Sequence, residues 1–300
     1  MSNLKRTTVL VLGSTGQIGN LVVNNLNKNE DIQVRITSRR KQDVERLMSE
    51  GKNAVYLDLD DPTSFGTAMA GVDRLFLCTG YTVAMLSQSK TIVDAARKAG
   101  VQHIVHLGIF GAWDCTDPHF VWHQMIEAYI KVSGIQWTNL HPNMFMENLL
   151  TFFAPKGDIF KTFWGNQRMG FIAGQDIADV AAAVLTQGPD KHGSQDYWMS
   201  TEALDGPEVA SVLSEVTGRK ITSEILYPDD FKELFTSDAI KVEQWYAEGG
   251  IEFVRQVSNG QMGYIGMVRD GVPYITGKPA LTLKEWATIN ADQLIEEAKK

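Results

Sequence analysis

Residues 8–19 read TVLVLGSTGQIG, an apolar run that passes directly into three glycines spaced three apart. The run Thr8–Leu12 predicts a buried β-strand, and a helix is expected to begin at the glycines. In this context Gly13 permits a tight turn, Gly16 lets the backbone approach a pyrophosphate, and Gly19 allows close packing of helix on strand. The stretch therefore predicts a dinucleotide-binding loop whose phosphates meet the helix N-terminus. The expected cofactor contacts in the loop are Gly13, Thr15, Gly16, Gln17, Ile18 and Gly19.

The first half of the chain alternates short apolar runs with amphipathic stretches, which is typical of βαβ units and a parallel sheet. The expected strands are Thr8–Leu12, Gln33–Thr37, Ala54–Leu57, Arg74–Cys78, His103–Leu107 and Ile135–Leu140, with a late strand at Gln195–Ser200. The expected helices are Asn20–Asn27, Asp43–Glu50, Ser64–Met69, Ser87–Ala99, Pro118–Val132, Asp176–Leu185 and Pro207–Thr217. The pattern predicts an α/β fold, with a Rossmann-type doubly wound parallel sheet and a smaller, mixed C-terminal domain on the substrate side.

The alternation weakens after Asn148, so we place a domain boundary near residue 150. Residues 1–150 are expected to form the nucleotide-binding domain, and segments near 169–200 are expected to return to it. Residues 151–300 then form a mainly substrate-side, discontinuous domain.

The end of the second strand decides between NAD and NADP. An NAD-binding protein usually presents a carboxylate there, whereas residues 37–41 read TSRRK. The planar guanidinium of Arg39 is the best candidate to meet a 2′-phosphate, although a solvated basic turn is the alternative. Asp58, after the third strand, is expected either to contribute on the adenine side or to cap a loop. The predicted cofactor is NADP(H).

Composition excludes several classes of function. The 300 residues carry 36 acidic and 28 basic side chains, a net charge of −8, and no cationic cluster suited to nucleic acid or anionic lipid. No apolar stretch approaches the roughly 20 residues that span a bilayer. Met1–Thr8 shows no secretion signal, and Cys78 and Cys115 alone do not indicate a disulfide framework. We therefore expect a cytoplasmic protein.

The chain resembles the NmrA-like family of atypical short-chain dehydrogenases over nearly its whole length. The matching stretches are Gly13–Gly19, Val34–Arg35 with Arg39, Asp58–Pro62, Ala99–Val101, His123 with Glu127, Ser133–Ile135 with Trp137–Thr138, Pro142, Asn148, Asp176–Val180, and Thr276–Pro279 with Leu283 and Trp286. The resemblance implies either an NADPH-dependent quinone or dye reductase or a cofactor-sensing regulator. Two positions depart from the family pattern, since Gly108 stands where many relatives carry Ser and His141 where Arg is common.

Typical short-chain dehydrogenases use a Tyr and a Lys four residues later on one helix. The only such pair here is Tyr274 with Lys278, and Pro273 and Gly277 argue against a helix at that place. The pair is therefore not expected to be catalytic.

On the helix after the fifth strand, His119, His123 and Glu127 recur every four residues and so share one face. We expect His123 to line the nicotinamide side as a proton donor or substrate orienter, with structural packing as the alternative. Glu127 is expected at the surface or behind other groups. A zinc site using Cys115, His119 and His123 is a weaker alternative, because no fourth ligand is evident. No metal is predicted.

Ligands of such sheets bind outside the carboxyl ends of the strands. We therefore expect the cofactor to be bordered by Thr79, Gly80, Gly108, Phe110, Pro142 and Phe145, with Asn143 as a polar, catalytic-side contact. The aromatic segment from Phe152 to Trp164 is expected either to offer a stacking surface for a planar substrate or to pack in a core.

These residues predict hydride transfer from NADPH to an apolar aromatic or conjugated acceptor such as a quinone or dye. The competing hypothesis is a non-catalytic NADP(H) sensor that acts through a protein partner. The expected partner is a small aromatic molecule, direct nucleic-acid binding and membrane association are not expected, and a homodimer is left open.

Overall fold

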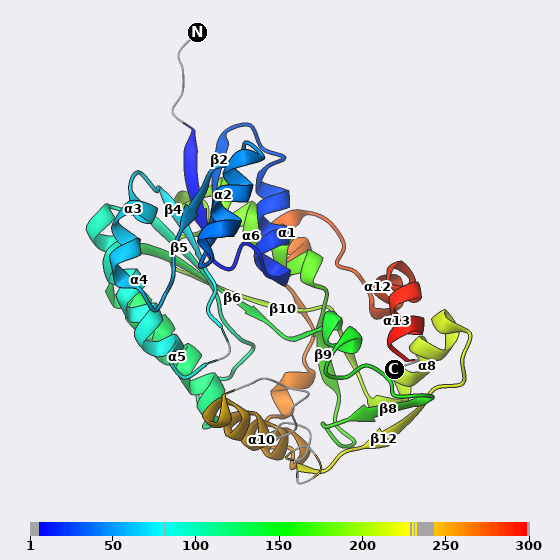
Figure 1. Cartoon of the computed structure of the whole chain (residues 1–300). Helices are drawn as coiled ribbons and strands as arrows, with labels where there is room; N and C mark the ends of the chain where they lie inside the picture. Colours follow the sequence, from blue (N-terminus) through cyan, green and yellow to red (C-terminus); the bar gives the residue numbers. More distant parts are fainter. Residues whose placement is uncertain (1–5, 81, 229, 231, 233–242, 299–300) are drawn as a thin grey trace.

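The structure, a computed structural model, describes residues 6–80, 82–228, 230, 232 and 243–298. Its centre is an eight-stranded sheet built from β1 (Thr7–Val11), β2 (Ile32–Ser38), β3 (Ala54–Tyr56), β4 (Arg74–Leu77), β5 (His103–Leu107), β6 (Gln136–Pro142), β10 (Gln195–Ser200) and β13 (Arg269–Asp270). The strand order is β13-β10-β6-β5-β4-β1-β2-β3, and all pairs are parallel except the edge pair β10–β13 (Figure 1). The order reverses between β1 and β4, which confirms the predicted doubly wound sheet.

Helices cover both faces of this sheet. One face carries α1 (Gln17–Leu26), α2 (Lys41–Ser49), α6 (Gly174–Gln187) and α11 (Gly271–Thr276) over one apolar cluster. The other carries α3 (Phe65–Met69), α4 (Met85–Ala99) and α5 (Pro118–Val132) over a second cluster. Short elements η1 (Pro62–Ser64) and α7 (Pro189–His192) lie in the connections. The central strands β1, β4 and β5 are buried on both faces, as their continuous apolar runs predict.

Local signals explain where the helices begin and end. Asp117 accepts the backbone N–H of Phe120, and Pro118 is the first residue of α5, as predicted. Gly100 ends α4 at φ +80°, a conformation that glycine adopts without strain.

A second group of elements lies beside the carboxyl ends of the strands. It contains β7 (Met144–Phe145), β9 (Met169–Ile172) and β11 (Glu202–Leu204) in one small sheet and β8 (Ile159–Thr162) and β12 (Thr222–Ile225) in another. Its helical elements are η2 (Met146–Leu150), α8 (Gly206–Thr217), α10 (Gln244–Ser258), η3 (Gly263–Gly266), α12 (Leu283–Ile289) and α13 (Ala291–Glu297). In Figure 1 this group occupies the lower right, with α10 next to one end of α5.

The aromatic segment forms the core of that second group rather than a substrate surface. Phe160 and Trp164 are fully buried and Phe163 nearly so, and all three belong to its apolar cluster. The core alternative therefore holds for these three rings, and only Phe152 is substantially exposed. The stacking-surface expectation was wrong for most of the segment.

The return of the chain to the main sheet is longer than expected. Segments α6 and β10 lie against the Rossmann part, but so do β13 and α11 near the C-terminus. The expectation that Pro273 prevents a helix was wrong, because Pro273 lies in the first turn of α11, where no intrahelical N–H is required. Gly277 ends that helix at φ +69°, so Lys278 lies beyond it and the Tyr274 pair is not on one helix face. The boundary near residue 150 stays a prediction.

Two further expectations concern membranes and termini. None of the helices in the described ranges is long and apolar enough to cross a membrane. Residues 1–5 of the stretch Met1–Thr8 lie outside the described residues.

Cys78 and Cys115 are both free thiols.

Candidate functional site

The glycine-rich loop has the shape that a pyrophosphate requires. Gly13 adopts φ +63°, and a Cβ atom at Gly19 would overlap the carbonyl oxygen of Gly13, so the turn and the close helix packing both need glycine. Helix α1 begins after Gly16 with no side-chain cap and no acidic residue in its first turn. Thr15 and Gln17 are exposed beside this helix end. Uncapped N–H groups and a positive dipole end therefore face solvent, and these residues fit the phosphates of a dinucleotide.

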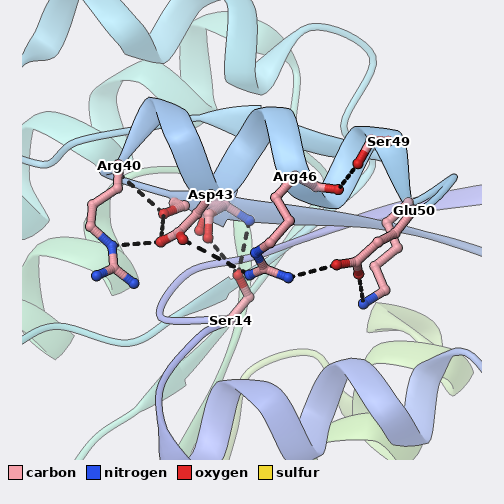
Figure 2. A network of polar contacts seen from close by, with 9 residues as sticks. Ser14, Arg40, Asp43, Arg46, Ser49 and Glu50 are labelled. Atoms are coloured by element: carbon pink, nitrogen blue, oxygen red, sulfur yellow. Dashed lines mark hydrogen bonds and ion pairs between the residues drawn. The ribbon is translucent and has the colours of Figure 1, made fainter.

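A buried serine fixes this loop to the second strand. The Ser14 hydroxyl donates to the carbonyl of Thr37 at 2.6 Å and accepts the N–H of Thr37 at 2.9 Å (Figure 2). Thr37 Oγ1 donates in turn to the carbonyl of Val11 at 2.8 Å. The phosphate loop and the end of β2 are thus held in one geometry before any cofactor binds. Ile18, by contrast, contributes a buried side chain to the packing of α1.

The two arginines after β2 differ in what they contact. Arg40 Nε lies 2.5 Å from Asp43 Oδ2, and Figure 2 shows its side chain directed at that carboxylate. Arg39 is exposed, and no hydrogen bond or ion pair engages its guanidinium among the described residues. Asp43 also faces Arg46 at 3.9 Å. Arg39 is therefore the guanidinium that remains available for a phosphate, and its role stays a prediction.

Asp58 already has a local function. Its carboxylate accepts the N–H of Asp60 at 3.1 Å, and the Ser64 hydroxyl contacts its backbone N–H at 3.2 Å. These bonds favour the loop-cap alternative over a direct cofactor contact.

The predicted rim residues lie at the carboxyl ends of β4, β5 and β6, as topology requires. Thr79 and Gly80 follow β4, and Gly80 is exposed. Gly108 and Phe110 are buried, and the Phe110 ring packs edge-on against Trp198 at 5.0 Å between centroids. Pro142 is buried, and Phe145 is half-buried against the main core. The structure brings these six residues to one edge of the sheet but does not test their contacts with a cofactor.

Asn143 is engaged within the protein. Its amide nitrogen donates to the carbonyl of Ile265 at 2.8 Å and to the Ser200 hydroxyl at 3.3 Å, and its oxygen accepts the N–H of Met144 at 2.9 Å. The buried amide therefore joins β6, β10 and η3. This geometry favours a structural role over the predicted catalytic one.

His123 is buried beneath the rim, with 9% of its surface exposed and Nδ1 lacking a hydrogen-bond partner in the described part of the chain. Burial is the main cause that holds its pKa well below the ordinary value, and neighbouring histidines add to the effect. The ring is neutral at physiological pH, so His123 cannot act alone as a charged proton donor. A neutral imidazole can still orient the acceptor, or pass on a proton that its other nitrogen regains.

The structure decides between the alternatives for two neighbours of His123. Glu127 lies behind other groups rather than at the surface: it is buried, and burial raises its pKa. The zinc alternative also fails, because Cys115, His119 and His123 are not among the metal-compatible groups found in the described ranges. His119 instead makes a hydrogen bond with the Tyr246 hydroxyl of α10.

The metal-compatible group that the described residues do form consists of Glu127, His141 and Asp196, with one ligand atom of each within 4.8 Å of the others. The polar atoms of this group already contact other groups of the protein. His141 Nδ1 contacts the carbonyl of Ile109 at 2.9 Å, and Lys131 Nζ lies 3.1 Å from Asp196 Oδ2. We therefore interpret the group as a partly buried ion-pair network whose outer members, Asp196 and Lys131, reach solvent.

Sequence reasoning missed this network because its members come from α5, β6 and β10. The four-residue spacing of His119, His123 and Glu127 was the available signal, and Lys131 continues it. Which strand residues face that stripe depends on the sheet order, which local spacing does not contain.

Comparison with known proteins was consistent with this geometry. The NmrA-like family model matches residues 5–258. An NAD(P)H azoreductase of Xenophilus azovorans is 30% identical over 288 residues, which cover 94% of this chain and 98% of the relative. Quinone oxidoreductase 2 of Escherichia coli strain K12 is 27% identical over 231 residues, covering 74% and 79% respectively. The crystal structure of Citrobacter sp. triphenylmethane reductase complexed with NADP(H) superposes with a TM-score of 0.81 at 25% identity, covering 95% of this chain and 99% of that one.

Proposed function

The chain belongs to the NmrA-like family, and on that premise we propose that it is an NADPH-dependent reductase. The acceptor of the hydride is an apolar aromatic or conjugated molecule such as a quinone or dye. The observation that carries the proposal is the exposed glycine loop, which opens into an uncapped helix N-terminus. The exposed guanidinium of Arg39, which has no partner in the described ranges, follows the strand to which this loop is hydrogen-bonded. Relatives named as azo and quinone reductases support the choice of acceptor.

The chain's own residues bind and orient the cofactor. The N–H groups at the start of α1, next to Gly16, hold the pyrophosphate. Arg39 pairs with the 2′-phosphate, and Thr79, Gly80 and Gly108 border the nicotinamide. When bound, NADPH supplies the hydride, which the protein itself cannot provide.

The acceptor is positioned at the same edge of the sheet. Because burial keeps the His123 ring neutral, its N–H orients the acceptor, and the ring does not supply the extra proton of an imidazolium ion. Beyond this small molecule, we infer no nucleic-acid partner, since the net charge is −8. The two free thiols favour a cytoplasmic location, and a homodimer is compatible with these features.

The test follows NADPH absorbance with a panel of quinones, azo dyes and cationic dyes, each without protein, with wild type and with His123→Ala. Oxidation that depends on both protein and acceptor is the expected result, and His123→Ala should raise KM or lower kcat for the best acceptor. Tight NADPH binding without oxidation by any acceptor would contradict a reductase and favour the cofactor-sensor alternative.

A further inference from the structure

Five of the six histidines of the chain lie on α5 or on the strands β5 and β6. Four of them belong to a cluster, which we call the histidine seam and which also includes two carboxylates. Its members are His106, His119, His123, Glu127, His141 and Asp196. Buried polar groups are usually satisfied by partners, so a concentration of titratable groups in one packed interface calls for a function.

The outer end of the seam is open to solvent. The Asp196 side chain is 36% exposed, and its Oδ1 lies 3.2 Å from His141 Nε2. Lys131 contacts the same carboxylate from α5. Burial alone lowers the pKa of His141, but the hydrogen bond to Asp196 and the nearby Glu127 carboxylate outweigh burial and raise it. His141 is therefore the seam histidine that holds a proton most readily.

Glu127 links this end to the interior. Its Oε1 lies 3.6 Å from His141 Nδ1. A Cβ atom at Gly108 would lie 2.7 Å from the same Oε1 and 3.5 Å from His106 Cε1, so the carboxylate and the His106 ring both border the space that the glycine leaves. Burial raises the pKa of Glu127, which favours transient protonation.

The inner part of the seam consists of neutral rings. His106 is fully buried, burial lowers its pKa to about 3, and the Asn139 side chain lies beside its ring. Its ring centroid lies 5.7 Å from that of His123, which lies 5.6 Å from that of His119. Such spacing leaves neighbouring nitrogens within reach through a small rotation or one water.

We propose that the histidine seam is a proton relay that carries a proton from solvent at Asp196 and His141, through Glu127 and His106, to His123 at the acceptor. This inference rests on the proposed reductase function and names the origin of the proton that the reaction consumes. Glu127, His141 and Asp196 act through other groups, so they are positioning residues and relay members rather than catalytic residues.

The balance of the reaction requires such a proton for some acceptors only. A quinone takes one hydride, which reduces it by two electrons, and one proton. Together they give the two O–H groups of the hydroquinone. His123 releases its N–H proton to the quinone oxygen and takes a proton on its other nitrogen from His106, so it stays neutral. His106 is resupplied by Glu127, and Glu127 by His141, whose Nδ1–H turns from the carbonyl of Ile109 at 2.9 Å to the Glu127 carboxylate at 3.6 Å. His141 then regains a proton from water at the Asp196 edge. A cationic triarylmethane dye, by contrast, becomes a neutral product by accepting hydride alone.

This difference gives the sharpest test. His106→Phe keeps a buried ring but removes both nitrogens, and Glu127→Gln keeps the shape of the side chain but cannot take up a proton. We expect both variants to lower kcat for a quinone by about 100-fold, the scale of a positioned proton donor. They should leave the rate with the cationic dye and the Kd for NADPH nearly unchanged. Equal loss for both acceptors, or no loss for either, would overturn the relay.

The matched control is His103→Phe, which removes another buried histidine of β5. His103 contacts a group outside the seam, since its Nε2 lies 2.8 Å from the Thr138 hydroxyl. This variant should affect quinone and cationic dye alike. If wild type reduces neither acceptor, the proposed function fails; if wild type reduces both and the seam variants match it, only the relay fails.

A second readout uses the cofactor-free protein. Histidine ring signals followed by NMR against pH should show His141 titrating above its ordinary value, while His106, His119 and His123 stay neutral at pH 6. Glu127→Gln removes the carboxylate that favours charged His141, so the midpoint of His141 should fall. A midpoint that is ordinary in wild type and unmoved in Glu127→Gln would contradict the relay independently of turnover.

Discussion

Replacing Arg39 by Ala should weaken the binding of NADPH while leaving that of NADH nearly unchanged. The two cofactors differ only in the 2′-phosphate, and the guanidinium of Arg39 is exposed at the end of β2, with no partner in the part of the chain that the structure describes. Arg40 is adjacent in sequence, but its Nε is held 2.5 Å from Asp43. Arg39 is therefore available to bind a phosphate, whereas Arg40 is already paired with a carboxylate.

The magnitude follows from the exposure of the site. A charge-assisted pair between guanidinium and phosphate contributes about 1.5–3 kcal/mol, and solvent screening at an exposed position places Arg39 at the lower end. We expect an increase in the Kd for NADPH of roughly 10-fold. Titration of intrinsic fluorescence or calorimetry with each cofactor measures this, and the difference between wild type and Arg39→Ala should shrink at high salt.

Arg40→Ala is the matched control, because it removes the same charge from the next residue. It should change the Kd for NADPH by less than Arg39→Ala does. The reasoning is refuted if Arg39→Ala weakens NADPH and NADH equally, or if Arg40→Ala has the larger effect on NADPH.

Three further predictions concern the loop and the start of α5. Gly19→Ala should abolish tight NADPH binding and destabilise the fold by about 1–3 kcal/mol, since its Cβ would overlap the Gly13 carbonyl; wild-type affinity in a cofactor titration would contradict this. Ser14→Ala should cost about 1–3 kcal/mol in urea unfolding, because the N–H and C=O of Thr37 lose their bonds to the hydroxyl. Burial raises the pKa of Asp117 to about 7 from 3.8, so the folded state binds the extra proton and wild-type stability falls as pH rises from about 4 to 7. Asp117→Asn should therefore gain stability relative to wild type across that window, by up to about 1.4 kcal/mol for each pH unit, and a pH-independent difference in unfolding free energy would count against it.

The sheet and its cofactor end could be predicted from sequence because their determinants are local. Each strand is a short apolar run, and α5 begins at an Asp–Pro pair, which is a strong local signal for a helix start. The glycine loop likewise encodes its function in residue identity, since only glycine permits the conformation of Gly13 and the close approach at Gly19. Neither feature needs knowledge of distant residues.

The second group of elements could not be derived in the same way. Whether Phe160 and Trp164 form a surface or a core depends on which helices cover them, and α8, α10 and α12 come from much later in the chain. The helix at Tyr274 was missed because local propensity treats proline as a breaker, whereas packing of α11 on α6 and β10 stabilises a single short helix that tolerates Pro273 in its first turn. Tertiary packing overrides the local preference in both cases.

The acid–base groups could be predicted only in part. The two residues that depart from the family pattern show why. Gly108 and His141 are far apart in sequence, yet both contact the space that Glu127 occupies. A side chain at position 108 would meet Oε1 of that carboxylate at 2.7 Å, and His141 Nδ1 lies 3.6 Å from the same atom. The glycine at position 108 therefore leaves the space that the buried Glu127 carboxylate occupies, and His141 gives this carboxylate a neighbour that can lose its proton. Both positions therefore border one carboxylate, an arrangement that only the pairing of β5 with β6 beneath α5 makes visible.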